Sequence, residues 1–153
     1  MGTQTDQVSV VTGGFEEPVH DAQRVFQAVM QALARPGTVH SIEPCADAPT
    51  PIYPATAALL QMLADADSPV WLDHAANTAT VKGWIGFHTG APMADTHGEA
   101  AFAVVSDAAK LPPLSMFALG TQEYPDRSTT LIIQVESLTE GAAMRLRGPG
   151  IKS

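Results

Sequence analysis

The sequence predicts an α/β domain in which helices flank a mixed, mostly parallel sheet. Stretches of helical periodicity alternate along the chain with short apolar stretches of strand length, which is the order of a layered α/β fold. Of the 153 residues, 45% are hydrophobic and only 16% are charged, so the chain can bury a core and lacks the composition of a disordered protein. We therefore expect one domain over residues 14–153, preceded by a flexible tail over residues 1–13.

The first element is an amphipathic helix that begins at Pro18, a residue that suits a first helical turn. Its apolar side chains recur at intervals of three and four residues, at Val19, Ala22, Val25, Phe26, Val29, Met30 and Leu33. This spacing gives the helix one apolar face. We expect Phe26, Met30 and Leu33 to be buried there, and the sheet against which they pack to include Ile132.

The later elements are assigned from their periodicity and from the glycines and prolines between them. The second helix is apolar on nearly all sides, which indicates burial. In chain order we expect a strand at 38–42, a proline-rich loop at 44–54, a helix at 55–64, a strand at 70–72, a helix at 75–87, a strand at 100–105, a short helix or turn at 114–119, a strand at 128–138 and its hairpin partner at 143–146.

Composition excludes several classes of function. The net charge is −8 and no Lys/Arg cluster is present, so nucleic-acid binding through phosphate neutralisation is not expected. Arg145 and Arg147 are read as solvated, although one or two arginines can hold a small phosphate ligand. No apolar run is long enough to span a membrane and no secretory signal is present, so a cytoplasmic protein is expected. The single cysteine, Cys45, excludes an internal disulfide and is expected to be inert.

Neither a metal nor a covalently bound cofactor is expected. The five histidines lack the spacing of a zinc site, and in the metal alternative His88, Asp95 and His97 are the first ligands to consider. Lys82 and Lys110 lie outside any recognisable cofactor motif, so Schiff-base chemistry is not expected.

Two polar segments are candidates for ligand binding. His88 and Thr89 stand at the end of an expected helix, where the alternative is a glycine cap followed by a proline. A second group directly precedes the clearest strand, where the alternative is ordinary turn chemistry. The second group consists of Glu123, Asp126, Arg127 and Ser128.

A set of short segments, each weak alone, is specific in combination and order. The segments are Gly14-Phe15, Pro18–Phe26, Met30–Gly37, Ala55–Leu60, Val70–Asp73, Phe87–Gly90, Gly120, Glu123–Thr129, Gln134-Val135 and Gly148–Ile151. Together they resemble the H-subunit family (PhnH) of the bacterial carbon–phosphorus lyase core complex, over roughly residues 14–151. Chains of this family normally continue past the Gly-Pro-Gly turn, so a C-terminal segment beyond Ser153 is expected.

The resemblance implies a fold similar to the large domain of pyridoxal-phosphate-dependent transferases, without the cofactor. It also implies action together with the G, I and J subunits. The complex transfers a phosphonate to the ribose of ATP and displaces adenine, which gives a ribose 1-phosphonate 5-triphosphate, while the J subunit cleaves the C–P bond. The expected function is therefore that of a subunit of the synthase complex that is not active alone.

Two alternatives remain open at this point: a stand-alone nucleotide or phosphonate transferase, and a purely structural homodimeric scaffold. For the isolated chain we expect an isologous homodimer, in line with the resemblance and with the low content of charged residues. Trp71 or Trp84 are the expected anchors of the contact surface, and a core position is the alternative for each.

Overall fold

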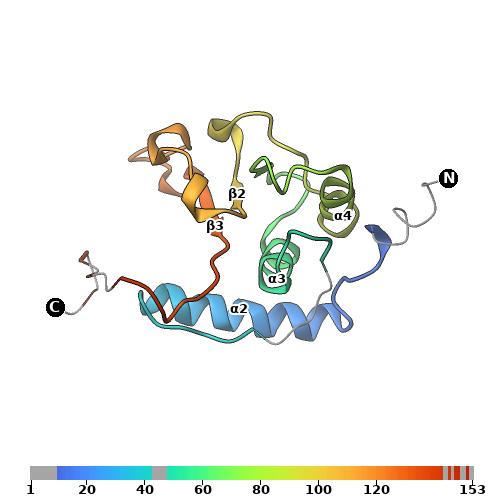
Figure 1. Ribbon diagram of the computed structural model, residues 1–153, viewed down its shortest axis with the longest axis horizontal. Helices are drawn as coiled ribbons and strands as arrows, with labels where there is room; N and C mark the ends of the chain where they lie inside the picture. Colours follow the sequence, from blue (N-terminus) through green and yellow to red (C-terminus); the bar gives the residue numbers. More distant parts are fainter. Residues whose placement is uncertain (1–9, 43–47, 143–144, 146, 149–150, 152–153) are drawn as a thin grey trace.

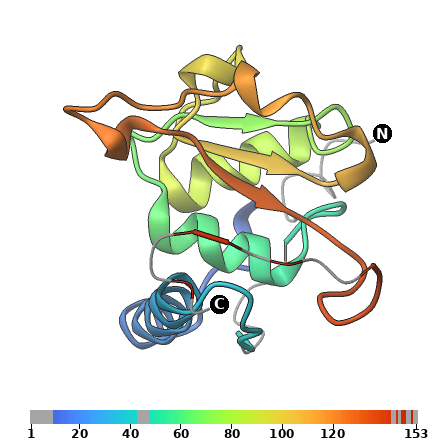
Figure 2. The same ribbon diagram turned by 90° about the vertical axis from the view of Figure 1, so that its left-hand side faces the viewer.

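The computed structural model describes residues 10–42, 48–142, 145, 147–148 and 151. Its longer elements are α2 (Pro18–Ala34), α3 (Pro54–Leu63), β1 (Val70–Leu72), α4 (Ala79–Thr89), β2 (Phe102–Val105) and β3 (Thr130–Ile133). Four single-turn 3₁₀ helices lie at His97–Glu99, Ala108–Lys110, Leu114–Met116 and Pro125–Arg127. The described strands form one sheet in the order β1-β2-β3, and both pairs are parallel (Figures 1 and 2). The predicted α/β class is confirmed as helices with a small parallel sheet.

Side chains along each strand alternate between the two faces of the sheet, and the register shows which of them share a face. Leu72 pairs with Val104, and Val104 pairs with Ile132, so these three side chains point to the same face. All three belong to the main hydrophobic core together with residues of α3 and α4, such as Leu60 and Trp84. The helices therefore cover this face of the sheet (Figure 2).

On the opposite face, Trp71 packs against two rings that come from later in the chain. Its ring centroid is 4.4 Å from that of His97 and 5.9 Å from that of Phe117. Trp71 is half-buried in this cluster, whereas Trp84 on α4 is fully buried at 0% exposure. The expectation that Trp84 anchors an intersubunit contact is therefore wrong, and the core alternative holds for it.

The helix α4 has a clear start and stop. The Thr78 hydroxyl accepts a hydrogen bond from the backbone N–H of Val81, which caps the first turn. At the other end Gly90 adopts φ of 73°, a left-handed conformation that glycine favours. The helix thus begins four residues later than the predicted 75–87.

The orientation predicted for the first helix is wrong. Phe26, Met30 and Leu33 are 51%, 48% and 71% exposed, while the buried side chains of α2 are Asp21 and Val25. The physical reason is the position of α2, which packs against α3 and lies on the far side of α3 from the sheet (Figures 1 and 2). Helical periodicity showed an apolar face but not which neighbour, if any, covers it.

Two strand predictions also need correction. Residues 38–42 form no strand, because the Thr38 N–H and hydroxyl both donate to the carbonyl of Arg35 and close a turn. The strand predicted over 128–138 is only the four residues of β3, because the hydroxyl of Ser137 accepts the N–H of Glu140 and starts another turn. The predicted hairpin partner at 143–146 lies largely outside the described residues, as does Cys45.

Among the described residues, no helix combines the length and the apolar character needed to cross a membrane.

Candidate functional site

The carboxyl ends of the three parallel strands meet at one edge of the sheet, and a polar residue follows each of them. Asp73 follows β1, Ser106 follows β2 and Gln134 follows β3. In open parallel sheets this edge is where ligands usually bind, since the loops there point in the same direction. We call this region the carboxyl edge.

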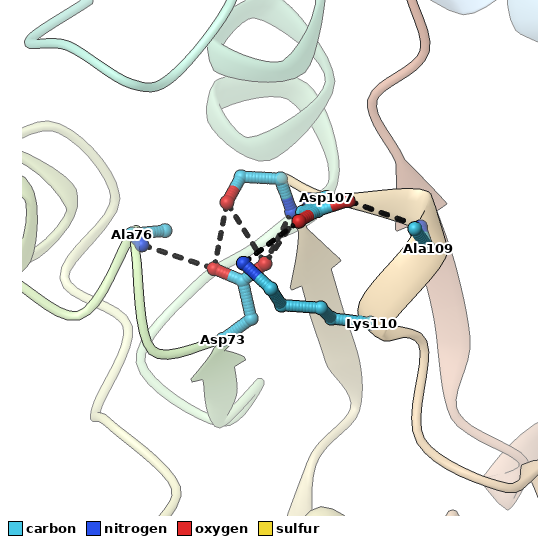
Figure 3. A network of polar contacts seen from close by, with 6 residues as sticks. Asp73, Ala76, Asp107, Ala109 and Lys110 are labelled. Atoms are coloured by element: carbon cyan, nitrogen blue, oxygen red, sulfur yellow. Dashed lines mark hydrogen bonds and ion pairs between the residues drawn. The ribbon is translucent and has the colours of Figure 1, made fainter.

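Asp73 is the centre of the polar network at the carboxyl edge (Figure 3). Asp73 is only 7% exposed, and its carboxylate accepts the backbone N–H groups of Ala76 at 2.9 Å and Ser106 at 2.7 Å. The Ser106 hydroxyl donates to the same carboxylate at 2.8 Å, and the N–H of Asp107 lies at 3.3 Å. Through these hydrogen bonds the buried carboxylate holds the residues that follow β1 and β2 together.

Asp107 begins the short 3₁₀ turn that follows β2. Its carboxylate accepts the N–H of Ala109 at 3.0 Å and forms an ion pair with Lys110, also at 3.0 Å (Figure 3). The hydrogen bond from Lys110 lowers the pKa of Asp107 below its ordinary value, and the same contact raises the pKa of Lys110. Lys110 is therefore held as a cation at this edge.

Gln134 ties a distant loop to the carboxyl edge. Its side-chain oxygen accepts the N–H of Tyr53 at 2.7 Å, and its side-chain nitrogen donates to the carbonyl of Pro51 at 2.9 Å. Both polar ends of a buried amide are thus satisfied by one loop. The result places Tyr53 beside the end of β3.

A cavity of about 720 Å³ lies at the carboxyl edge, a volume in the range of small-molecule sites. Its lining is mixed and consists of Tyr53, Ser106, Asp107, Ala108, Ala109, Gln134, Val135, Glu136, Ser137, Glu140 and Gly141. Its described lining holds three carboxylates, those of Asp107, Glu136 and Glu140, and no Lys or Arg side chain, while Lys110 pairs with Asp107. This surface suits hydroxyl, amine or nucleobase groups as hydrogen-bond donors, and it repels the phosphates of a triphosphate.

The predicted binding loop lies at the other end of the sheet. Asp126, Arg127 and Ser128 line a cavity of about 400 Å³ with residues that precede β1 and β2, such as Ser68 and Ala100. The loop is largely held by its own contacts, since the guanidinium of Arg127 lies 4.1 Å from the ring centroid of Tyr124. Glu123 is exposed in the same loop and is not among the residues that line the cavity.

His88 and Thr89 stand apart from that loop at the end of α4. The Thr89 hydroxyl donates to the carbonyl of Ile85 and accepts the N–H of Ala91, which is a helix-end role. The ring of His88 packs against Trp84 with centroids 4.6 Å apart. Gly14 fits against this ring because it has no side chain: a Cβ there would lie 2.7 Å from the His88 Nδ1.

The other candidates from the sequence do not converge. His97 lies in the Trp71 cluster and His88 beside Trp84, and no group of three or more potential metal ligands occurs within the part of the chain that the structure describes. Lys82 is exposed beside a cavity of about 130 Å³ that Asp95 also lines, and Lys110 is paired with an acid. Neither lysine has the dry pocket that a Schiff base needs, so these residues do not fit pyridoxal phosphate.

Sequence reasoning did not single out Asp73, Ser106 or Gln134 as site residues. A signal for them was present, because each is the first polar residue after a buried apolar run, in Val70-Trp71-Leu72-Asp73, Ala103-Val104-Val105-Ser106 and Leu131-Ile132-Ile133-Gln134. In a parallel sheet, residues at such positions must lie at one edge.

Comparison with known proteins adds two findings. A family model described as bacterial phosphonate metabolism protein (PhnH) matches residues 13–153. The chain is also 45% identical over 149 residues to the alpha-D-ribose 1-methylphosphonate 5-triphosphate synthase subunit PhnH of Rhizobium meliloti (strain 1021). That alignment covers 97% of this chain and 74% of the relative.

Proposed function

Because the chain belongs to the PhnH family of bacterial phosphonate metabolism proteins, we propose that it is a subunit of a complex that synthesises alpha-D-ribose 1-methylphosphonate 5-triphosphate. In this proposal the complex transfers the phosphonate to the ribose of ATP and releases adenine. The observation that carries the proposal is the 45% identity to a subunit of such a synthase, over 97% of the chain.

The partners in this proposal are the G, I and J subunits, and the isolated chain is a homodimer. Support for a role in assembly comes from the exposed apolar side chains of α2, since large apolar side chains that gather on a surface usually mark protein contacts. The fold of the family, similar to the large domain of pyridoxal-phosphate-dependent transferases, remains part of the same prediction.

The charge at the carboxyl-edge cavity supports a subunit without a complete active site. Among the described residues at the carboxyl edge, the acids Asp107, Glu136 and Glu140 line the cavity, and Lys110 is paired with one of them, Asp107. A triphosphate and a phosphonate need cationic groups to bind. We therefore propose that other subunits hold these anionic groups, and that the carboxyl edge of this chain faces at most the uncharged part of the nucleotide.

The proposal is tested by reconstitution. The G, I and J subunits are assayed for adenine release from ATP and methylphosphonate, with and without this chain, and co-purification is followed by size-exclusion chromatography. We expect the chain to co-purify and the activity to require it. A stand-alone transferase would instead release adenine with this chain alone, and a scaffold without a role in the reaction would co-purify but leave the activity unchanged.

A further inference from the structure

The two outer edges of the sheet differ in how they are covered. At the edge formed by β1, the N–H of Val70 donates to the carbonyl of Pro92 and its carbonyl accepts the N–H of Ala94, both at 2.9 Å. The segment around Met93 therefore closes that side of the sheet. At the opposite edge β3 is the last strand of the row (Figure 2), and within the described part of the chain no strand pairs with its outer side.

The register shows which backbone groups of β3 face outward. The N–H groups of Thr130 and Gln134 both donate toward β2, at 2.9 and 2.8 Å. Because the backbone groups of successive residues in a strand point to opposite sides, positions 130, 132 and 134 face β2 and positions 131, 133 and 135 face away from it. The N–H and C=O groups of Leu131 and Ile133 thus point out of the sheet, where the described residues supply no partner strand.

The first position of this outer row is already paired. The N–H of Thr129 donates to the carbonyl of Ala118 at 2.9 Å, and Leu119 forms an antiparallel bridge with Ser128. Thr129 lies two residues before position 131 and so belongs to the same outward row. A neighbouring backbone therefore fits along this side of β3, and in the described residues the pairing stops where β3 begins.

The remainder of the edge lacks the residues that usually keep an edge strand from pairing. Natural edge strands carry charged side chains, prolines or bulges for this purpose, whereas the sequence from 130 to 135 contains no charged residue, proline or glycine. Apolar side chains are exposed beside the unpaired groups: Ile133 is 39%, Val135 37% and Leu119 76% exposed. Unpaired backbone groups flanked by apolar side chains are the features that an added strand covers.

We propose that the outer edge of β3 binds an extended segment of a partner subunit, which extends the sheet by one strand. Backbone hydrogen bonds to Leu131 and Ile133 hold the segment, and apolar side chains at alternate positions of it pack beside Ile133 and Val135. The inference rests on the proposed function, from which the partner is another subunit of the synthase complex, and it adds the surface and the mode of binding.

Charge at the carboxyl end of β3 specifies the partner segment further. Glu136 and Glu140 are exposed there, and among the described residues neither carboxylate has an ion-pair partner. A lysine or arginine at the corresponding end of the segment would be attracted to both acids. A second copy of this chain would instead bring the same acids and a net charge of −8, so a basic segment of a different subunit is the occupant that the charges favour.

The first test measures amide hydrogen exchange of the isotope-labelled chain by NMR, alone and bound to the G, I and J subunits, with the complex dissociated after exchange. In the isolated chain the outward N–H groups of Leu131 and Ile133 should exchange about tenfold or more faster than the inward N–H of Ile132. In the complex the exchange of Leu131 and Ile133 should slow by about tenfold or more.

The outcomes separate this proposal from the proposed function. Fast exchange of Leu131 and Ile133 in a complex that releases adenine overturns the strand addition and leaves the proposed function intact. Slow exchange of both in the isolated chain also overturns it, because the edge would then be covered by this chain itself or by a second copy. A chain that does not bind the other subunits contradicts both proposals.

The second test compares Ile133→Pro with Ile133→Val in binding to the other subunits. Proline removes the outward N–H without removing a hydrogen bond to β2, whereas valine keeps the N–H and the branched side chain. We expect Ile133→Pro to weaken binding by about tenfold or more and Ile133→Val by less than about threefold. Circular dichroism checks the fold, and Val135→Pro with Val135→Thr is the second pair if Ile133→Pro does not fold. Equal binding by the two members of a folded pair overturns the proposal.

The third test addresses the charge of the partner segment. Glu136→Lys should weaken binding to the other subunits by about fivefold or more and reduce its dependence on salt. Asp67→Lys is the control, because Asp67 is exposed in the turn before β1 and the substitution changes the net charge by the same amount. An equal effect of the two substitutions overturns the basic character of the segment.

Discussion

Ser106 donates both its backbone N–H and its hydroxyl to the carboxylate of Asp73, so the residue after β2 closes the turn that follows β1. The two residues are 33 positions apart and are brought together by the parallel pairing of the strands. The contact fixes the positions of the loops that surround the cavity at the carboxyl edge.

Replacement of Asp73 by Ala should destabilise the domain by about 3 kcal/mol, because several buried N–H and O–H donors lose their acceptor at once. Urea unfolding followed by circular dichroism measures this free energy. Asp67→Ala is the control, since the side chain of Asp67 is exposed, and its effect should stay within about 0.5 kcal/mol. Equal stabilities of the two variants would show that the network does not hold the sheet together.

Leu60→Ala should cost about 2–5 kcal/mol, because Leu60 is fully buried on α3 and its truncation leaves a cavity. Phe26→Ala should cost less than about 1 kcal/mol at concentrations where the chain is monomeric, because half of its side chain is already in water. Thermal or urea unfolding of both variants under the same conditions checks the order. A larger loss for Phe26→Ala than for Leu60→Ala would mean that α2 packs through its other face.

Asp21 should contribute stability that depends on pH. The backbone N–H of Glu17 and the guanidinium of Arg24 hold the pKa of this carboxyl below its ordinary value of 3.8. Because the folded state lowers the pKa, the contribution is complete above about pH 4 and is lost as the pH falls through the folded value.

Asp21→Asn should therefore lower the urea midpoint at neutral pH and flatten the decline of stability as the pH falls below about 4. Asp67→Asn serves as the control and should leave the shape of the pH profile as in the wild type. A profile of Asp21→Asn parallel to that of the wild type would remove Asp21 as a source of the acid sensitivity.

Substitutions at the two ends of the sheet should change the rate of adenine release by the reconstituted complex to different extents. Ala108→Trp places a bulky ring in the cavity at the carboxyl edge without removing a hydrogen bond of the Asp73 network, and it should lower the rate of adenine release about tenfold or more. Arg127→Ala alters the cavity at the other end and should change the rate less than twofold. The reverse order of effects would assign the site to the loop with Asp126, Arg127 and Ser128 instead.

The sequence was sufficient to predict the elements whose ends are marked by local chemistry. The helix expected at 55–64 is α3, which begins at Pro54, and the strand expected at 70–72 is β1. The sequence also indicated the cap at Gly90, because a glycine after a helical stretch, with Pro92 two residues later, is typical of a left-handed helix end.

What depends on tertiary position was not predictable in the same way. The stripe with Phe26 has the same periodicity whether a helix packs on the sheet or on another helix, so its exposure followed only from the position of α2. The alternation at residues 38–42 looks like a strand, but a strand forms only where a neighbour supplies hydrogen bonds, and Thr38 bonds to Arg35 instead.

Because β2 lies between β1 and β3, the order of the strands in the sheet is the order in which the ribosome makes them. The pairing of β1 with β2 and the contacts between Asp73 and Ser106 require nothing beyond Asp107. Until β3 has been synthesised, the outer edge of β2 exposes unpaired N–H and C=O groups on the apolar segment Phe102–Val105. During synthesis this open edge is a site at which the nascent chain can aggregate, and a chaperone that shields it would protect the chain until β3 has been made.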